Sequence, residues 1–296
     1  MSRLAAAALA LAAGLAQAGA LPSSPPRGCD RSHDITATQQ DRLLRFTAVI
    51  RQALAESGAQ AALISRSGTD LSRFGLRYSH AGVALADGLD TPWAVRQLYY
   101  ACVEGASRLF DQGLAGFVAG SDDADLGYVS LLLLPPEAAG PLTTATRDNA
   151  LALGLLNARY SANAYPFSTR YQNCNQWVAE LLAAATAGGR TRDDAQAWLR
   201  REGYAPEPVH ASPWLMLAGR FVPWLHFDDH PQAQLADGAV QTSLPTSLEA
   251  FALARWPAAR RIEFCHGPRG FVQREAGAPL AAGCVPQDGD RVTALD

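Results

Sequence analysis

The sequence predicts an α+β fold, because helical segments and short apolar strands follow one another without the regular alternation of parallel βαβ units. The chain has 296 residues, of which 48% are hydrophobic and 18% charged, as is typical of a globular protein with a sizeable core. This length fits one large domain, or a core with a substantial extension. We therefore expect mixed helices and strands rather than a doubly wound parallel sheet.

The N-terminal half of the chain predicts one helix followed by strands. Apolar residues recur at helical spacing over residues 38–57, and Gly58 ends that helix. The strands are short apolar runs between turn residues. They are expected, in order, over residues 61–65, 78–85, 95–103 and 127–134, and the third is expected to be the hairpin partner of the second.

The C-terminal half predicts more helix than strand. A polar, aromatic loop covers residues 160–172. The pattern Thr246-Ser247-Leu248-Glu249 is typical of a capping box and predicts the start of a short helix, and a hairpin is expected over residues 262–272. The other helices are expected over residues 143–157, 174–187 and 193–201.

The first twenty residues have the layout of a secretory signal peptide. One basic residue, Arg3, precedes an apolar run over residues 4–15. Ala16-Gln17-Ala18 then provides an A-x-A cleavage pattern, and Ala18-Gly19-Ala20 is a second one. The run is short for a membrane span, and the alternative is a buried N-terminal helix. We expect residues 1–20 to be removed, leaving a periplasmic or secreted protein without a later transmembrane segment.

The composition excludes several classes of function. All 25 basic residues are Arg, so lysine Schiff-base chemistry and a P-loop lysine are ruled out. The net charge of −3 without basic runs argues against nucleic acid as a partner, since binding it needs clustered positive charge. Neither a dinucleotide fingerprint nor a G-x-S-x-G elbow occurs. We predict no cofactor and no bound metal.

The expected export determines how the cysteines are interpreted, as disulfide partners or as a free thiol. In an oxidising compartment they should pair where geometry allows, and an odd number leaves one thiol free. A lone thiol in an exported protein is a candidate for a functional role. The five cysteines are Cys29, Cys102, Cys174, Cys265 and Cys284.

Cys174 is the candidate for a reactive thiol. It lies where the polar loop turns into a helix, so unpaired backbone N–H groups and the helix dipole should face its sulfur and lower its pKa. Trp177, Val178 and Leu181 continue its helix face, which should hold the sulfur against a neighbouring sheet. The alternative is a small buried residue on an apolar helix face.

His80 is the candidate partner of this thiol. By alternation it shares a strand face with Tyr78, Gly82 and Ala84, and the two small residues would let a helix approach closely. A histidine beside the amino end of a helix is the base and general acid that a cysteine nucleophile needs. A strand histidine taken alone is usually structural, so the pairing with Cys174 carries the functional interpretation.

These segments together resemble two families. RYSHAGV (residues 77–83) and NCNQWV (residues 173–178) resemble the motifs of the circularly permuted NlpC-type branch of papain-like cysteine hydrolases, in which the histidine strand precedes the nucleophile helix. ISRSG (residues 64–68) resembles the segment before that strand. The whole chain, including RFGLR (residues 73–77) and QNCNQW (residues 172–177), also resembles an exported bacterial domain-of-unknown-function family, 2145.

The first resemblance, which covers about residues 61–187, implies a papain-like core with an antiparallel sheet packed against the nucleophile-bearing helix. That core would span residues 21–189, and residues 190–296 would form a helical and hairpin extension packed on it. The resemblance implies Cys174 as nucleophile and His80 as base. The backbone N–H of Cys174 would then form part of an oxyanion hole.

The family's third, orienting residue has no standard match in this sequence. Gln97 is the best candidate, since it should oppose His80 across the hairpin turn, and Tyr99 and Glu104 are alternatives. Residues close to the two motifs are expected to contact the substrate or line the oxyanion side. These are Tyr78, Tyr171, Gln172, Asn173 and Trp177.

If Cys174 is the free thiol, the other four cysteines can pair in three ways. We predict Cys265–Cys284 across the C-terminal hairpin and Cys29–Cys102 as a tether of the N-terminus. Each bridge would add about 3 kcal/mol by restricting the unfolded chain.

Two further features carry weaker signals. His226 and His230 have the spacing of metal ligands, but Pro223 and Pro231 bracket them and disfavour a single ligand-bearing helix face. The Trp-rich residues 214–227 are typical of core, with an apolar wall for an acyl chain or contact with a membrane surface as alternatives.

The sequence therefore predicts an exported cysteine hydrolase that cleaves an amide or ester bond of a cell-envelope substrate, either a peptide or an acyl group. The alternative is a non-catalytic papain-like envelope protein that binds a partner or a lipid in the corresponding cleft.

Overall fold

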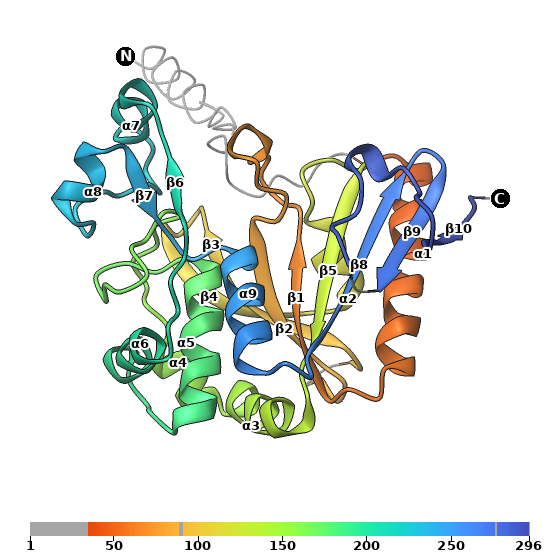
Figure 1. The fold of residues 1–296 in the computed structure, drawn as a ribbon, viewed down its shortest axis with the longest axis horizontal. Coiled ribbons are helices and arrows are strands. Elements are labelled where there is room, and N and C mark those ends of the chain that lie inside the picture. The colour runs from red at the N-terminus through yellow and green to blue at the C-terminus, as the bar shows by residue number, and fades with distance from the viewer. Residues whose placement is uncertain (1–34, 89–90, 276, 296) are drawn as a thin grey trace, which may run out of the picture.

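An antiparallel sheet of eight strands forms the centre of the protein (Figure 1). The computed structural model describes residues 35–88, 91–275 and 277–295. The strands lie in the order β10-β9-β8-β5-β1-β2-β3-β4. Their bounds are β1 (Ala61–Arg66), β2 (His80–Leu85), β3 (Ala94–Ala101), β4 (Ala106–Gln112), β5 (Gly127–Leu133), β8 (Arg260–Gly267), β9 (Gly270–Glu275) and β10 (Arg291–Thr293). A separate pair joins β6 (Pro208–His210) to β7 (Ala239–Gln241).

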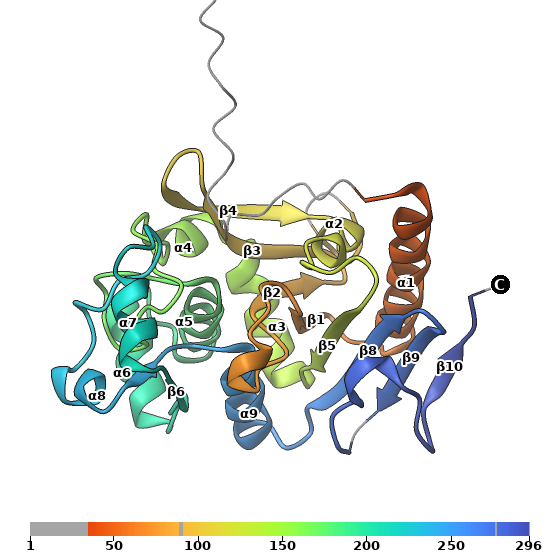
Figure 2. The same cartoon turned by 90° about the horizontal axis from the view of Figure 1, so that it is seen from above.

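Helices cover both faces of the large sheet (Figures 1 and 2). One face packs against α1 and α2, and the other packs against α3, α5, α6 and α9. The mixed α+β class is thus confirmed, with a large antiparallel sheet. The helices are α1 (Ala37–Glu56), α2 (Leu114–Ala119), α3 (Pro136–Arg147), α4 (Asn149–Gly154), α5 (Cys174–Ala187), α6 (Arg192–Arg201), α7 (Pro213–Gly219), α8 (Gln232–Ala236) and α9 (Pro245–Arg255).

Each central strand contributes side chains to both faces, because successive residues of a strand point in opposite directions. Leu63 and Val83 belong to the core on the α5 side, whereas Ile64 and Ala84 belong to the core on the α1 side. The central strands are therefore buried on both faces. This explains why they occur in the sequence as nearly continuous apolar runs.

Gly82 allows β2 and β3 to lie close together. A Cβ atom at this position would be 2.6 Å from Val95 Cγ1 and 3.3 Å from Gln97 Cβ. The space next to Gly82 is thus filled by the neighbouring strand. The expectation that it receives a helix is wrong.

Most predicted elements are confirmed, among them α1, β1, β2, β3, β5, α5 and α6. The helix predicted over residues 143–157 differs, because Asp148 is extended (φ −72°, ψ 95°) and separates α3 from α4. The prediction of a capping box that begins at Thr246 is also wrong. Helix α9 begins at Pro245 after Leu244, which makes no side-chain cap. The strand β4 and the helix α2 were not predicted.

The C-terminal strands complete the central sheet, since β8 pairs directly with β5 and β9 pairs with β8. The sheet therefore crosses the boundary predicted at residue 190. The disulfide Cys265–Cys284 is confirmed. Cys102 is disulfide-bonded, whereas Cys29 and the predicted signal peptide lie outside the described residues.

None of the described helices combines the length and the apolar character that a membrane crossing requires.

Candidate active site

Helix α5 begins at Cys174, and its amino end is held by the side chain of Asn173. The Oδ1 atom of Asn173 accepts a hydrogen bond from Gln176 N (2.7 Å), as an N-cap residue does. Its Nδ2 atom donates to Thr242 Oγ1 (2.9 Å) and to Ser243 O (3.2 Å). The cap is therefore tied to the segment between β7 and α9, which fixes the position of Cys174.

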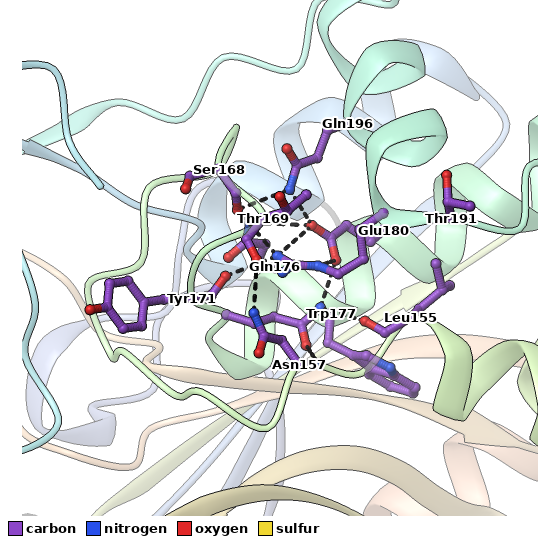
Figure 3. Close-up of polar contacts among 12 residues, drawn as sticks. Leu155, Asn157, Ser168, Thr169, Tyr171, Gln176, Trp177, Glu180, Thr191 and Gln196 are labelled. Carbon is purple, nitrogen blue, oxygen red and sulfur yellow. Dashed lines mark hydrogen bonds and ion pairs between the residues drawn. The ribbon is translucent and has the colours of Figure 1, made fainter. Parts of the chain in front are cut away.

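A buried polar network anchors the loop before α5 (Figure 3). Its centre is Glu180, which is fully buried and accepts from Arg192 Nε (2.7 Å), Gln172 Nε2 (2.6 Å) and Gln196 Nε2 (2.7 Å). The Arg192 guanidinium also donates to Tyr171 O (2.9 Å). Burial raises the pKa of Glu180, and the Arg192 charge and the amide donors oppose that rise.

Cys174 is the free thiol among the described cysteines, and it is only 6% exposed. Burial raises its pKa to about 11, although the backbone N–H groups of Ala81 and Asn175 act in the opposite direction. The expectation of a lowered pKa is therefore wrong. The N–H groups at the helix start do face the sulfur, but loss of solvent outweighs them.

His80 begins β2 and is held by Gln97, the residue predicted to orient it. His80 Nε2 lies 2.6 Å from Gln97 Oε1, and Gln97 Nε2 donates to Gln112 Oε1 (2.7 Å). Because Gln97 presents its oxygen to the ring, Nε2 carries the proton and the lone pair lies on Nδ1. Of the alternatives, Tyr99 packs edge-on against the ring at 5.4 Å, whereas Glu104 pairs with Arg108.

The imidazole of His80 is neutral over the physiological range. Burial and the nearby charge of Arg66 lower its pKa to about 3, while the bond to Gln97 acts in the opposite direction. A neutral imidazole can accept a proton, whereas an imidazolium cannot. The resting site thus contains a thiol and a neutral base rather than an ion pair.

Cys174 and His80 line the same cavity, whose volume is about 600 Å³. Helix α5 packs on the strand face of Ala81 and Val83, opposite to the predicted face of Gly82 and Ala84. The sulfur lies next to the N–H of Ala81, and the His80 ring packs against Phe117 of α2 at 5.8 Å. Among the described residues, no hydrogen bond joins the two groups.

Arg66 is a member of the site that sequence reasoning missed. It is the last residue of β1, pairs with His80 across the sheet, and is 4% exposed. Its guanidinium donates to Gly120 O and to Tyr99 Oη (3.3 Å), and it also lines the cavity. The charge of Arg66 contributes to the lowered pKa of His80 and opposes the rise that burial causes in the pKa of Cys174. Arg66 lies one residue after the strand predicted over residues 61–65, and nothing in the local sequence indicates that its side chain belongs to the site.

Two residues predicted to contact substrate belong to the structural core. Tyr78 Oη donates to Glu263 Oε1 (2.7 Å), and burial raises the pKa of Tyr78. Trp177 is fully buried, and its Nε1 donates to Ala152 O (3.2 Å). Neither residue lines the cavity, so the structure corrects both assignments.

The other three predicted substrate or oxyanion residues are also absent from the cavity lining. Tyr171 stacks on His226 with ring centroids 4.3 Å apart. Gln172 is fully buried in the Glu180 network, and Asn173 caps α5. All three hold the loop and the helix in place, because their polar atoms already have partners within the protein.

The two histidines with metal-like spacing have separate environments. His226 stacks on Tyr171, and His230 Nε2 lies 2.7 Å from Asn163 O. Within the part of the chain that the structure describes, no group of three or more His, Cys, Asp or Glu side chains is placed to hold a metal ion.

Comparison with known families gives one match. The model of a family of uncharacterized proteins conserved in bacteria, DUF2145, matches residues 53–252, which include every residue lining the cavity. No curated protein and no solved structure matches the chain. The match covers about two thirds of the chain and confirms the resemblance of the RFGLR and QNCNQW segments. The chain therefore belongs to the DUF2145 family of bacterial proteins.

Proposed function

We propose that this protein is an exported thiol hydrolase with a papain-like core of the permuted NlpC type. One observation carries the proposal: the free thiol of Cys174 and the neutral imidazole of His80, itself held by an amide oxygen, line one cavity. A cysteine, a base and a residue that orients the base are the parts that nucleophilic catalysis needs. The substrate is an amide or ester of the cell envelope.

In the proposed reaction, His80 Nδ1 takes the thiol proton as the sulfur attacks the carbonyl carbon. The transfer occurs directly after a side-chain rotation, or through one water molecule, since catalytic hydrogen bonds often form only when substrate is bound. Gln97 keeps the proton on Nε2, so that Nδ1 is the basic atom. The imidazolium then protonates the leaving group, and water hydrolyses the thioester.

Two groups are suited to stabilise the negative charge of the reaction. The backbone N–H of Cys174 lies at the positive end of α5, where a developing oxyanion is favoured. The charge of Arg66 acts against the rise that burial causes in the pKa of Cys174, so it also favours a thiolate or an oxyanion there.

The decisive experiment measures hydrolysis of a panel of envelope-derived peptides and of p-nitrophenyl esters. Cys174→Ser and His80→Ala should each lower kcat/KM by at least about a hundredfold. The control is His210→Ala, an exposed histidine outside the cavity, which should leave the rate unchanged. A rate that Cys174→Ser does not alter, or no turnover of any substrate, would reject the hydrolase.

The pH profile tests the role of His80 separately. Because the pKa of His80 is lowered to about 3, kcat/KM should not fall between pH 8 and pH 5. A histidine with its ordinary pKa would instead lose the base form as the pH falls through about 6.5. A decline of that kind in the wild type would show that the surroundings of His80 do not lower its pKa, and only its loss in His80→Ala would assign the decline to His80.

A second candidate function is a non-catalytic envelope protein that binds a partner or lipid in the cavity. The observation that favours it is the thiol itself, which is 6% exposed and has a pKa raised to about 11. This candidate predicts ligand binding that Cys174→Ser leaves intact, together with no turnover by the wild-type protein.

Export is part of the proposal. The A-x-A signal pattern predicts it, and the Cys265–Cys284 disulfide is of the kind that persists in oxidising compartments. Fractionation of a bacterium that expresses the full chain should find the protein in the periplasm or the medium. Recovery in the reducing cytosol would contradict the proposal.

A further inference from the structure

The cavity that contains Cys174 is walled by apolar side chains from segments far apart in the sequence. Its volume of about 600 Å³ lies within the range of small-molecule sites, roughly 300–1,000 Å³. Much of the wall comes from the segment after β1 and from α7 with the turn that follows it. These residues include Leu71, Phe74, Leu76, Leu215, Met216 and Val222.

Several side-chain donors in the wall are occupied by bonds within the protein, whereas the acceptor Asn175 Oδ1 has no hydrogen-bond partner among the described residues. The side-chain donors of Asn163, Asn175 and Thr242 bind backbone carbonyls, namely His226 O (2.8 Å), Ser243 O (3.1 Å) and Ala164 O (3.0 Å). A peptide in this cavity would leave many of its own amide groups without partners, which is costly. An apolar chain has no amide groups of its own to leave without partners.

The helix α7 has two apolar faces. Leu215, Gly219 and Val222 line the cavity, and they are spaced so that they share one side of the helix and its following turn. Trp214, Leu217 and Phe221 recur at the same spacing on another side, where they are 80%, 48% and 82% exposed. An exposed apolar patch can mark a site of contact with a membrane or with another protein.

We propose that the cavity binds the acyl chain of a membrane lipid, which reaches it past α7 while Trp214, Leu217 and Phe221 rest in the bilayer surface. Tryptophan and phenylalanine beside the exposed Arg220 suit the boundary between acyl chains and headgroups. The acyl carbonyl then lies near Cys174. The proposal that the acyl chain binds depends only on the cavity, whereas cleavage of the acyl ester rests on the proposed function.

The reaction on such a lipid balances without a co-reactant other than water. The sulfur of Cys174 forms a thioester with the acyl carbon as the ester C–O bond breaks, and the proton held by His80 goes to the leaving alcohol. Water then adds to the thioester, which releases the fatty acid and restores the thiol.

Binding is tested first, in a form that does not depend on catalysis. Cys174→Ser protein should bind 11-(dansylamino)undecanoic acid with a rise in fluorescence. Adding Met216→Glu, which puts a charge into the cavity wall, should weaken binding at least about tenfold. Its neighbour provides the matched control: Leu217→Glu, outside the cavity lining, should change the affinity less than about twofold. Equal losses in both variants, or no binding to the parent protein, would overturn the acyl site.

Chain length is tested next, on the wild-type protein. For p-nitrophenyl esters from acetate to decanoate, kcat/KM should rise about fourfold for each added CH₂ until the cavity is filled. Turnover that is independent of chain length would overturn the acyl site but keep the hydrolase. Fatty-acid binding without turnover of any ester would keep the acyl site and reject the hydrolase.

The source of the chain is tested with vesicles of phosphatidylethanolamine and phosphatidylglycerol. The wild-type protein should sediment with them, and the double variant Trp214→Ser/Phe221→Ser should not. The same double variant should bind the dansyl fatty acid like its parent, because neither side chain lines the cavity. If both proteins sediment with the vesicles, or if neither does, the membrane is not the source of the chain.

Discussion

Around the start of α5, buried polar side chains are joined into one network, whereas α7 presents exposed apolar side chains to the solvent. Glu180 is fully buried and is bonded to Arg192 and three glutamines, while Trp214 on α7 is 80% exposed. Both regions border the same thiol, one by carrying it and the other by walling its cavity. The helix that carries the nucleophile is therefore held by many polar bonds, whereas the α7 wall beside it is held by few.

This difference is what a site for apolar ligands needs. A buried ion pair fixes geometry because breaking it leaves an uncompensated charge, so the loop and helix that carry Cys174 have little freedom to move. The cavity-lining side chains of α7 include Leu215 and Met216, which are apolar and take part in no ion pair, so no comparable polar bond fixes this wall. The predictions below test how far the two regions differ.

The largest effect is expected from Glu180→Ala. The substitution leaves the Arg192 guanidinium buried without its carboxylate and should lower the free energy of unfolding by about 3–5 kcal/mol. Urea denaturation of the variant and the wild type provides the measurement. Glu202→Ala is the control, because that glutamate lies near the surface with Arg255 at 3.7 Å and should cost less than about 1 kcal/mol. Similar losses in both variants would mean that the network does not stabilise the α5 region.

A second buried carboxylate sharpens the comparison, because Glu249 on α9 has a much weaker partner. Its contact with Arg261 is 4.0 Å, and burial with the nearby charge of Glu263 raises its pKa to about 7. The folded state therefore binds more protons than the unfolded chain between the ordinary pKa of about 4.5 and pH 7. Stability should be highest below that window and fall as the pH rises through it.

Glu249→Gln removes this dependence. At pH 8 the variant should be more stable than the wild type by up to about 3 kcal/mol, whereas at pH 4.5 the two should be nearly equal. Urea unfolding at the two pH values tests the expectation. If the free energy of unfolding of the wild type rises relative to that of the variant as the pH increases from 5 to 8, Glu249 is ionised in the folded state without cost.

The next effect in size concerns the strand that carries His80. Gly82→Ala would place a Cβ atom 2.6 Å from Val95 and 3.0 Å from Arg96 O, so β2 and β3 must separate at a cost of about 1–3 kcal/mol. Gln97 would move with β3, and hydrolysis should therefore fall together with stability. Gly154→Ala, at the end of α4 with open space around it, should change neither quantity. An equally mild effect at Gly82 would mean that the two strands tolerate a wider spacing.

The strands and helices were predictable where the signal is local. The helix α5 follows from a polar loop, a run of apolar residues and a terminal glycine pair, and β5 follows from an apolar run ending at two prolines. The bond between Gln97 and His80 could be anticipated for the same reason, since both residues belong to one hairpin. The Asp148 break and the strand β4 were missed, because short or weakly patterned segments depend on their neighbours.

The site could be predicted only in part, because its electrostatics come from tertiary packing. A helix start indicates a lowered thiol pKa, but burial under the sheet reverses the direction at Cys174. The charge of Arg66 acts on His80 because β1 and β2 pair in one register, which sequence alone does not specify. Tyr171 and Gln172 lie beside the nucleophile in sequence, yet the Tyr171 ring stacks on His226 and the Gln172 side chain points into the Glu180 network.

The smallest effect on stability is expected at Trp214, and the buried Trp177 provides the contrast. Trp214→Ser on α7 should change the free energy of unfolding by less than about 0.5 kcal/mol, because an exposed side chain already meets water in the folded state. Trp177→Ala on α5 should instead cost about 3–5 kcal/mol, since that side chain is fully buried and bonded to Ala152 O. Thermal unfolding of the two variants measures the contrast. A tryptophan that contributes nothing to stability is free to serve a surface contact, so a clear loss at Trp214 would mean that its packing within the protein explains its presence.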